Sequence, residues 1–270
     1  DSVGLYIPGG AATYPSSLIM NAVPAIVSGV KRIVCVTPPS ENFDPYILGI
    51  LNKLGIYEVY QIGGAQAIGA LTFGTKTIKP VNKIFGPGNH FVTSAKKQVF
   101  GKVGIDLIAG PSEIVVVADK KNNPKWVASD LMAQAEHDIN AQSILITTNK
   151  SFAKKVLKEI DYLSKKLSKK QIINQSLRKN GLIILVNEIS ISSKIINYIA
   201  PEHLHLQTDE KDKILAKISN AGSIFMGEYS TEAFGDYIVG TNHILPTSGS
   251  AKFSSGLSVL DFMKRSSIVK

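Results

Sequence analysis

Two polar residues near the middle of the chain have the types and spacing to act on one ligand. Gln134 and His137 follow Pro124, whose place before a run of apolar and small residues predicts a helix from about Pro124 onward. Residues three apart share one face of a helix, so both side chains should converge. An imidazole and a side-chain oxygen at this spacing can hold two corners of a zinc site. A half-exposed helix with a solvated His and Gln is the alternative interpretation.

An acid and a base stand side by side further along the chain. Glu202 and His203 lie between Pro201 and Leu204, at the start of a predicted strand. Adjacent side chains on a strand point to opposite faces, so at the strand's mouth the pair could address two sides of one substrate. An imidazole, whose ordinary pKa is about 6.5, can accept a proton from an alcohol, and a carboxylate can take one from water. A surface Glu–His pair is the alternative.

A third polar stretch, residues 234–247, contains Asp236 and His243. Asp236 is a candidate third metal ligand and His243 a candidate polar contact, while a glycine-punctuated surface loop explains the same residues without chemistry. Gln, His and Asp supply nitrogen and oxygen donors, which suit zinc or manganese, and the spacing does not choose the metal. The single cysteine, Cys35, lies in an apolar, strand-like run; it excludes an internal disulfide and a cysteine-based zinc cage.

Composition and charge narrow the classes of protein. The 270 residues, 44% of them hydrophobic, are enough for two α/β lobes with a buried core. No apolar run reaches the roughly 18 residues of a membrane span, and no signal peptide is visible, so the cytoplasm is the expected compartment. The net charge of +9 invites a nucleic-acid interpretation, but the lysines of residues 154–170 follow the pattern of one amphipathic helix's solvated face. We therefore expect neither a membrane nor a nucleic acid as partner.

Elements that would position these residues alternate between strand and helix along the chain. Such alternation predicts βαβ units with a parallel sheet. We expect strands at 4–7, 32–37, 58–62, 83–85, 143–147, 181–186, 203–207 and 223–226, a crossover strand pair within 106–117, and helices at 18–28, 45–54, 91–100, 151–167, 192–199 and 212–218, with further helices after 63–69 and from 124.

Glycine-rich loops follow three of the early strands and precede helices, at residues 8–10, 63–64 and 86–88. They should lie at the carboxyl edge of the sheet, where open α/β folds bind ligands. Each alone reads as a tight turn, and none has the fingerprint of a dinucleotide or Walker loop, yet three on one edge favour a nucleotide or phosphate site. The prediction is an α/β protein of two Rossmann-like lobes, with mostly parallel sheets flanked by helices.

Seven motifs together resemble the histidinol dehydrogenase family, in its order and with similar spacing over essentially the whole chain. They are GLYIPGG at 4–10, GGAQA at 63–67, FGPGN at 85–89, AGPSE at 109–113, QAEH at 134–137, PEHL at 201–204 and GDYIVGTNHILPT at 235–247. The resemblance implies an enzyme that uses NAD and zinc to oxidise L-histidinol through the aldehyde to L-histidine, by two hydride transfers.

The resemblance also implies roles for individual residues. His203 would deprotonate the substrate hydroxyl, and Glu202 would activate water for the second oxidation. Gln134, His137 and Asp236 would ligate zinc, which would orient the imidazole and amine of histidinol. The remaining implied contacts are to NAD (Tyr6, Gln66, Asn89) and to the substrate (Ser112, and His243 from the partner subunit of a homodimer).

The predicted domains are a first α/β lobe on the NAD side at 1–112, a second lobe with the zinc and catalytic residues at 113–257, and the start of a C-terminal segment at 258–270. Chains of the family extend further at both ends, and their C-terminal segment supplies a further zinc ligand. We therefore expect a partial sequence of an enzyme. The alternative is a non-catalytic or incomplete metal- or nucleotide-binding relative.

Overall fold

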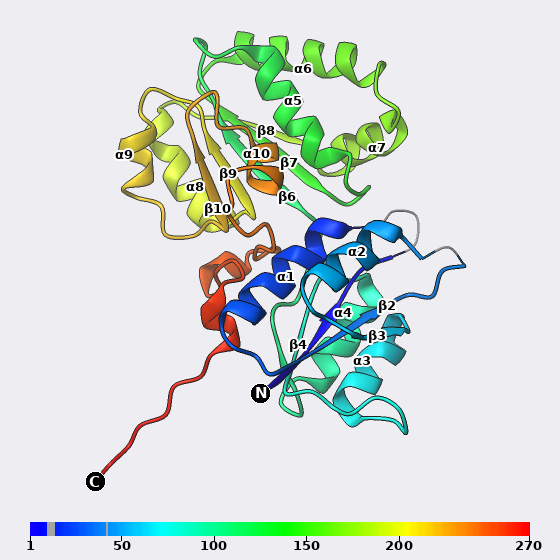
Figure 1. The fold of residues 1–270 in the computed structure, drawn as a ribbon. Coiled ribbons are helices and arrows are strands. Elements are labelled where there is room, and N and C mark those ends of the chain that lie inside the picture. Colours follow the sequence, from blue (N-terminus) through cyan, green and yellow to red (C-terminus); the bar gives the residue numbers. More distant parts are fainter. Residues whose placement is uncertain (10–13, 42) are drawn as a thin grey trace. The chain divides into compact units, whose positions relative to one another are not determined.

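Figure 1 shows the computed structural model of the chain, which describes residues 1–9, 14–41 and 43–270. Its contacts divide it into two compact units. The first comprises Asp1–Ala109, Asn242–Ile244 and Leu257–Lys270, and the second comprises Gly110–Thr241 and Leu245–Gly256. The domain ranges 1–112, 113–257 and 258–270 stay a prediction, and the two units differ from them in being discontinuous. Gly10 of the first glycine-rich motif lies outside the described residues.

The first unit is built on a five-stranded parallel sheet in the order β3-β2-β1-β4-β5. Its strands are β1 (Ser2–Tyr6), β2 (Arg32–Thr37), β3 (Glu58–Gln61), β4 (Lys83–Phe85) and β5 (Gly104–Ile105), and its helices are α1 (Pro15–Val27), α2 (Pro45–Lys53), α3 (Gly64–Phe73) and α4 (His90–Val99).

Helices cover both faces of this sheet because its strands are apolar on both sides. Leu5 and Cys35 face the core under α1 and α2, whereas Val34 and Val36 face the core under α3 and α4. The short 3-10 helix η3 (Val259–Phe262) also packs on this unit, with the Phe262 ring stacked on Phe85 at 4.0 Å between centroids. The end of the chain therefore contributes to the first core.

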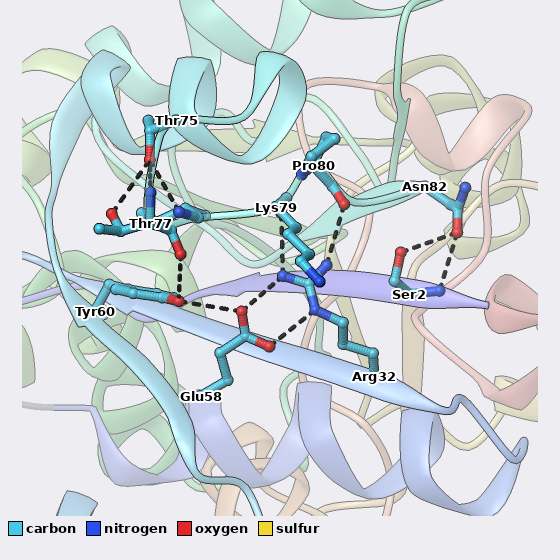
Figure 2. A network of polar contacts seen from close by, with 10 residues as sticks. Ser2, Arg32, Glu58, Tyr60, Thr75, Thr77, Lys79, Pro80 and Asn82 are labelled. Carbon is cyan, nitrogen blue, oxygen red and sulfur yellow. Dashed lines mark hydrogen bonds and ion pairs between the residues drawn. The ribbon is translucent and has the colours of Figure 1, made fainter.

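A polar network closes the amino end of the first sheet (Figure 2). Arg32 forms a bidentate pair with Glu58, at 2.8 and 2.6 Å, and donates to the backbone carbonyls of Lys79 and Pro80. Hydrogen bonding within this pair raises the pKa of Arg32 and lowers that of Glu58. The Tyr60 hydroxyl donates to the Thr77 carbonyl at 3.0 Å. These contacts fasten the loop before β4 to the starts of β2 and β3.

The second unit has a second five-stranded parallel sheet, in the order β10-β9-β6-β7-β8. Read from β8 to β10, the strands occur as third, second, first, fourth and fifth of their unit, which is the strand order of the first unit. Its strands are β6 (Glu113–Val117), β7 (Gln142–Thr147), β8 (Leu182–Leu185), β9 (His203–Leu206) and β10 (Ser223–Met226). Both units are therefore doubly wound around a central strand, β1 or β6.

Six α-helices accompany the second sheet in the described part of the chain. They are α5 (Pro124–Ala135), α6 (Lys150–Ser164), α7 (Lys170–Asn180), α8 (Ser192–Ile199), α9 (Lys211–Leu215) and α10 (Glu232–Tyr237), with the short 3-10 helices η1 (Ile189–Ile191) and η2 (Ser250–Lys252) in the connections. α5 and α6 pack on one face of the sheet, α7 packs against both of these helices, and α8 and α9 pack on the other face.

The predicted fold class is confirmed, and every strand pairing among the described residues is parallel. No helix in that part of the chain is long and apolar enough to cross a membrane.

Two local predictions were wrong, and one alternative interpretation holds only in part. The lysine-rich segment forms two helices, α6 and α7, because the chain turns after Ser164 so that Ile173 and Leu177 can pack beside Met132 and Ala135 of α5. Residues 106–112 form no strand, since β5 ends at Ile105 and Pro111, which lacks an N–H, precedes β6. The alternative interpretation of residues 234–247 as a surface loop fits only part of them, because the first ones belong to α10.

Candidate metal centre and acid–base pair

The acid and base of PEHL lie at the amino end of the second unit's sheet. His203 is the first residue of β9, Glu202 precedes it, and both are buried. The adjacent strand β6 begins at Glu113, whose backbone N–H donates to Glu202 Oε2 at 3.1 Å. The carbonyl oxygen of Glu113 lies 3.2 Å from His203 Nδ1. A single residue of the neighbouring strand thus holds both members of the pair through its backbone.

The Glu113 carbonyl also decides which imidazole nitrogen is suited to act as a base. A carbonyl oxygen only accepts hydrogen bonds, so His203 Nδ1 carries the proton in this contact, and a neutral ring then has its lone pair on Nε2. Nε2 lies 3.8 Å from Glu232 Oε1, and Nδ1 lies 3.7 Å from Glu202 Oε2. The ring is therefore placed between two buried carboxyl groups, with the basic nitrogen toward Glu232.

Glu232 belongs to α10, which begins with this residue and presents Asp236 one turn later. Since residues four apart share a helix face, both carboxyl groups point the same way. Together with His137 they form a group whose candidate ligand atoms all lie within 4.8 Å of one another. The structure therefore brings the predicted pair His137 and Asp236 together and adds Glu232, which the sequence analysis did not single out.

The third member of this group, His137, lies just after the end of α5. α5 ends at Ala135, so His137 lies in the following turn, and its backbone N–H bonds to the Gln134 carbonyl oxygen at 3.2 Å. The expectation that Gln134 and His137 both lie on the helix is therefore wrong, because the helix ends two residues too early. Gln134 lies in the last turn of α5, and its side chain is 1% exposed.

Burial governs the acidity of the carboxyl groups around this centre. It raises the pKa of Glu202 to about 8 and that of Glu232 to about 8, and the charge of Asp236 acts in the same direction on both. Burial likewise raises the pKa of Glu113, against the hydrogen bonds it receives from backbone groups. Buried acids in such proximity favour a bound cation, which would stabilise their ionised forms.

The donor set fits a divalent metal ion such as zinc. One imidazole nitrogen and carboxylate oxygens converge, without cysteine, as expected of a nitrogen and oxygen site. A further observation points the same way: Gln134 Oε1 is buried and has no hydrogen-bond partner among the described residues. A buried amide oxygen without a donor is costly, and a metal ion would satisfy it.

Sequence reasoning missed Glu232 and Glu113 for different reasons. Glu232 stands four residues before Asp236, so a helix prediction for this stretch would have placed the two on one face. Glu113 is part of the AGPSE motif, but its role rests on the pairing of β6 with β9, which links residues 90 positions apart. No local pattern carries that information.

Candidate cofactor residues of the first unit gather at the carboxyl end of its sheet. Tyr6 ends β1, and its hydroxyl accepts a hydrogen bond from the Gly64 N–H, at the first residue of α3. Gln66 lies in the first turn of that helix and is exposed. Asn89 caps α4 by accepting from the N–H groups of Phe91 and Val92. The structure thus brings Tyr6 and the start of α3 together, and contact with NAD stays a prediction.

A buried ion pair that the sequence did not reveal secures the adjacent loop. The ammonium of Lys96 and the carboxylate of Asp106 pair with their side chains 2% exposed. Lys96 Nζ also donates to the Gly86 carbonyl at 3.1 Å, and the Gly86 N–H donates to Asp106 Oδ2 at 2.7 Å. Gly86 has φ of +107°, and a Cβ there would lie 2.1 Å from the Tyr6 carbonyl oxygen. The FGPGN motif thus begins at a turn that only glycine fits.

For two predicted substrate-binding residues, Ser112 and His243, the structure shows burial and local contacts. Ser112 is half-buried just before β6, and its carbonyl oxygen accepts from the Gln142 N–H at 2.9 Å. His243 groups by its contacts with the first unit and is half-buried. Their approach to a substrate stays a prediction.

Fold and site together define a protein with two doubly wound α/β units, one of which carries a candidate metal centre beside an acid–base pair. The sequence model of the family described as Histidinol dehydrogenase matches residues 1–270. The chain therefore belongs to the histidinol dehydrogenase family.

Individual relatives are similar over nearly the whole chain. Histidinol dehydrogenase of Clostridium acetobutylicum is 56% identical over 99% of the chain, and that of Agrobacterium fabrum is 54% identical over 100%. A crystal structure of histidinol dehydrogenase from Elizabethkingia anophelis matches 97% of the chain with a TM-score of 0.94 and 44% identity. The chain spans 62%, 63% and 61% of these three relatives, respectively. An acetylating aldehyde dehydrogenase from Geobacillus thermoglucosidasius, at 12% identity and a TM-score of 0.62, shares the fold alone.

Proposed function

We propose that the chain belongs to an enzyme that oxidises L-histidinol through L-histidinaldehyde to L-histidine, the last step of histidine biosynthesis, with NAD and zinc as cofactors. Family membership over residues 1–270 supports the reaction. The observation that carries the proposal is the buried Glu202–His203 pair beside the donor group of His137, Glu232 and Asp236. Here a base can take the hydroxyl proton of an alcohol, and the adjacent metal-binding group can orient that alcohol.

His203 would take the proton in the first oxidation. With Nδ1 donating to the Glu113 carbonyl, Nε2 accepts the proton of the substrate hydroxyl as the hydride leaves the carbon atom. The alcohol thereby loses one hydride and one proton and becomes the aldehyde. NAD supplies the oxidant, because it accepts the hydride in each of the two steps.

Glu202 would act in the second oxidation, where water must add to the aldehyde. An ionised Glu202 can take a proton from that water as the water oxygen bonds to the aldehyde carbon. The hydrate anion so formed gives its hydride to NAD and becomes the carboxylic acid, which releases a proton to yield the carboxylate. Burial raises the pKa of Glu202 to about 8, so the carboxylate holds a proton taken from water more tightly than an exposed glutamate would. The Glu113 N–H holds the carboxylate in place during both steps.

Gln134, His137 and Asp236 would hold the zinc ion. Bound there, it would orient the imidazole and amine of histidinol as a Lewis acid, a positioning role. Ser112 would bind the substrate, and His243 would approach it from the partner subunit of a homodimer. Tyr6, Gln66 and Asn89 would contact NAD at the carboxyl end of the first sheet.

The test is NADH formation, followed by its absorbance, from this chain with L-histidinol, NAD and zinc. We expect His203→Asn to lower turnover on the order of 10²–10⁴-fold while zinc stays bound, since the imidazole acts on the substrate proton. A variant that turns over as fast as the unchanged chain would refute the base assignment. Zinc and NAD binding without any histidinol-dependent NADH would instead favour a non-catalytic or incomplete relative.

A further inference from the structure

A buried row of polar side chains runs along β9 beyond the acid–base pair. His203, His205 and Gln207 alternate with leucines, so all three point to the same face of the sheet. His205 is fully buried, at 0% exposure. Its Nδ1 lies 2.5 Å from Asp130 Oδ2, and its Nε2 lies 2.7 Å from the Gly227 carbonyl oxygen. The proposed reaction uses neither His205 nor Asp130.

Hydrogen bonds on every side fix the orientation of this pair. The Gly227 carbonyl only accepts, so His205 Nε2 carries a proton. The Asp130 carboxylate already accepts from the Thr231 hydroxyl at 2.6 Å and from the Gln207 amide at 3.2 Å. The short contact between His205 Nδ1 and Asp130 Oδ2 holds one proton between the two atoms, so the two residues form a buried, hydrogen-bonded pair.

The pair is connected to both ends of the segment that leads into α10. His205 binds the backbone at Gly227, and Asp130 binds the side chain of Thr231, which occupies the N-cap position of α10. An N-cap threonine ordinarily bonds to the N–H groups of its own helix, but Thr231 makes no such side-chain bond and turns its hydroxyl to Asp130. The hydroxyl of Thr231 therefore forms a tertiary hydrogen bond to α5 in place of a capping bond to its own helix.

Asp130 also connects α10 with the other half of the donor group. It lies on α5, one turn before Gln134, and is 4% exposed. α10 has only six residues; its Phe234 and Tyr237 are exposed, and its Gly235 packs against the Phe225 ring of β10. The bond from Thr231 to Asp130 ties the start of α10 to α5, next to Glu232.

We propose that Asp130 and His205, acting through Thr231, are positioning residues for the metal centre: they hold the start of α10 in the place where its carboxylates meet His137. This inference rests on the metal site of the proposed function. Groups of this kind, which orient the residues around a metal, typically change metal affinity on the order of 10–100-fold when removed.

The experiment is zinc affinity of the folded chain, measured by competition with a chromophoric chelator, for Thr231→Val and Thr231→Ser. The valine variant keeps the side-chain shape but loses the hydroxyl, so zinc affinity should fall on the order of 10–100-fold. The serine variant keeps the hydroxyl and should restore the affinity of the unchanged chain. Thr72→Val is the matched control: it also removes a buried threonine hydroxyl, bonded to the Ile68 carbonyl at 2.7 Å in the first unit, and should leave zinc affinity unchanged.

The variants separate positioning from general stability, because a merely structural role would lower the free energy of unfolding without changing zinc affinity of the folded chain. Asp130→Asn provides a second test should the valine variant not fold, since its amide retains a hydrogen-bonding group but removes the charge, and zinc affinity should again fall. Unchanged affinity in the folded variants would overturn the inference.

The failure of the inference can be told from failure of the proposed function. If His137→Ala loses zinc while Thr231→Val binds it normally, the metal site stands and the positioning role falls. If the unchanged chain binds no zinc, both fall. If the variants follow the expected pattern but no histidinol is oxidised, the positioning role stands and the proposed activity does not.

Discussion

Replacing Glu202 with glutamine should change how the stability of the second unit depends on pH. Burial raises the pKa of this carboxyl group from 4.5 in solution to about 8 in the folded chain. The folded state therefore keeps the proton at pH values where the unfolded state has released it. This contribution to stability is complete below about pH 4.5 and is lost as the pH rises through about 8.

The size of the effect follows from these two values. Each pH unit between them lowers the free energy of unfolding by about 1.4 kcal/mol, so the loss between pH 5 and pH 9 is on the order of 4 kcal/mol. Glutamine has nearly the same shape, can still accept from the Glu113 N–H and does not titrate in this range. The variant should thus gain stability relative to the unchanged chain as the pH rises.

Urea unfolding at several pH values, in the presence of a chelator, measures this difference. Trp126 is the only tryptophan of the chain and lies on α5, so its fluorescence reports on the second unit. Other buried acids such as Glu232 titrate in both proteins, and the comparison therefore isolates residue 202. Adding zinc should reduce the difference, because a cation near Asp236 favours the ionised carboxylate. A difference between variant and unchanged chain that stays constant from pH 5 to pH 9 would refute the reasoning.

Three further outcomes test separate parts of the structure. His137→Ala should lower zinc affinity and histidinol binding together, and equal zinc content with unchanged activity would contradict its assignment as a ligand. Gly86→Ala should destabilise the chain by about 3 kcal/mol or more in urea unfolding, because its Cβ would strike backbone, whereas Gly101→Ala, which also has positive φ but open space around it, should cost only about 1 kcal/mol. Lys96→Met should cost about 3–5 kcal/mol by leaving Asp106 buried without its cation, and adding Asp106→Asn to that variant should recover part of the loss; a double variant no more stable than the single one would argue against the pair.

The fold was predictable wherever hydrophobic periodicity and element length agreed. The strand over 32–37 and the helix over 192–199 occur as predicted because their apolar residues have the period of the element and the ends have clear breaks. The break between α6 and α7 carries no proline or glycine, so local sequence did not reveal it; tertiary packing of Ile173 against α5 decides it. α10 was not predicted either, because its six residues are too few to establish a helical period.

Some residues of the candidate site could be predicted from the sequence, and others depend on contacts between distant segments. Residue types and family resemblance pointed to Glu202, His203 and Asp236, and the structure brings these close to Glu232. It took the pairing of β6 with β9 to show that the Glu113 carbonyl selects the basic nitrogen of His203. The buried pair of Asp130 and His205 joins residues 75 positions apart, a relation that no spacing along the chain expresses.

The two units share one strand order but carry their candidate functional residues at opposite ends of the strands. In the first unit, the glycine-rich loops follow the carboxyl ends of β1, β3 and β4; in the second, the acid–base pair and Glu113 stand at the amino ends of β9 and β6. A map of mutational tolerance should therefore be inverted between the units. Outside the Arg32–Glu58 network and the segment 227–231, substitutions and short insertions should be accepted most readily at the amino edge of the first sheet and at the carboxyl edge of the second, so that each unit leaves a different rim open to evolutionary drift.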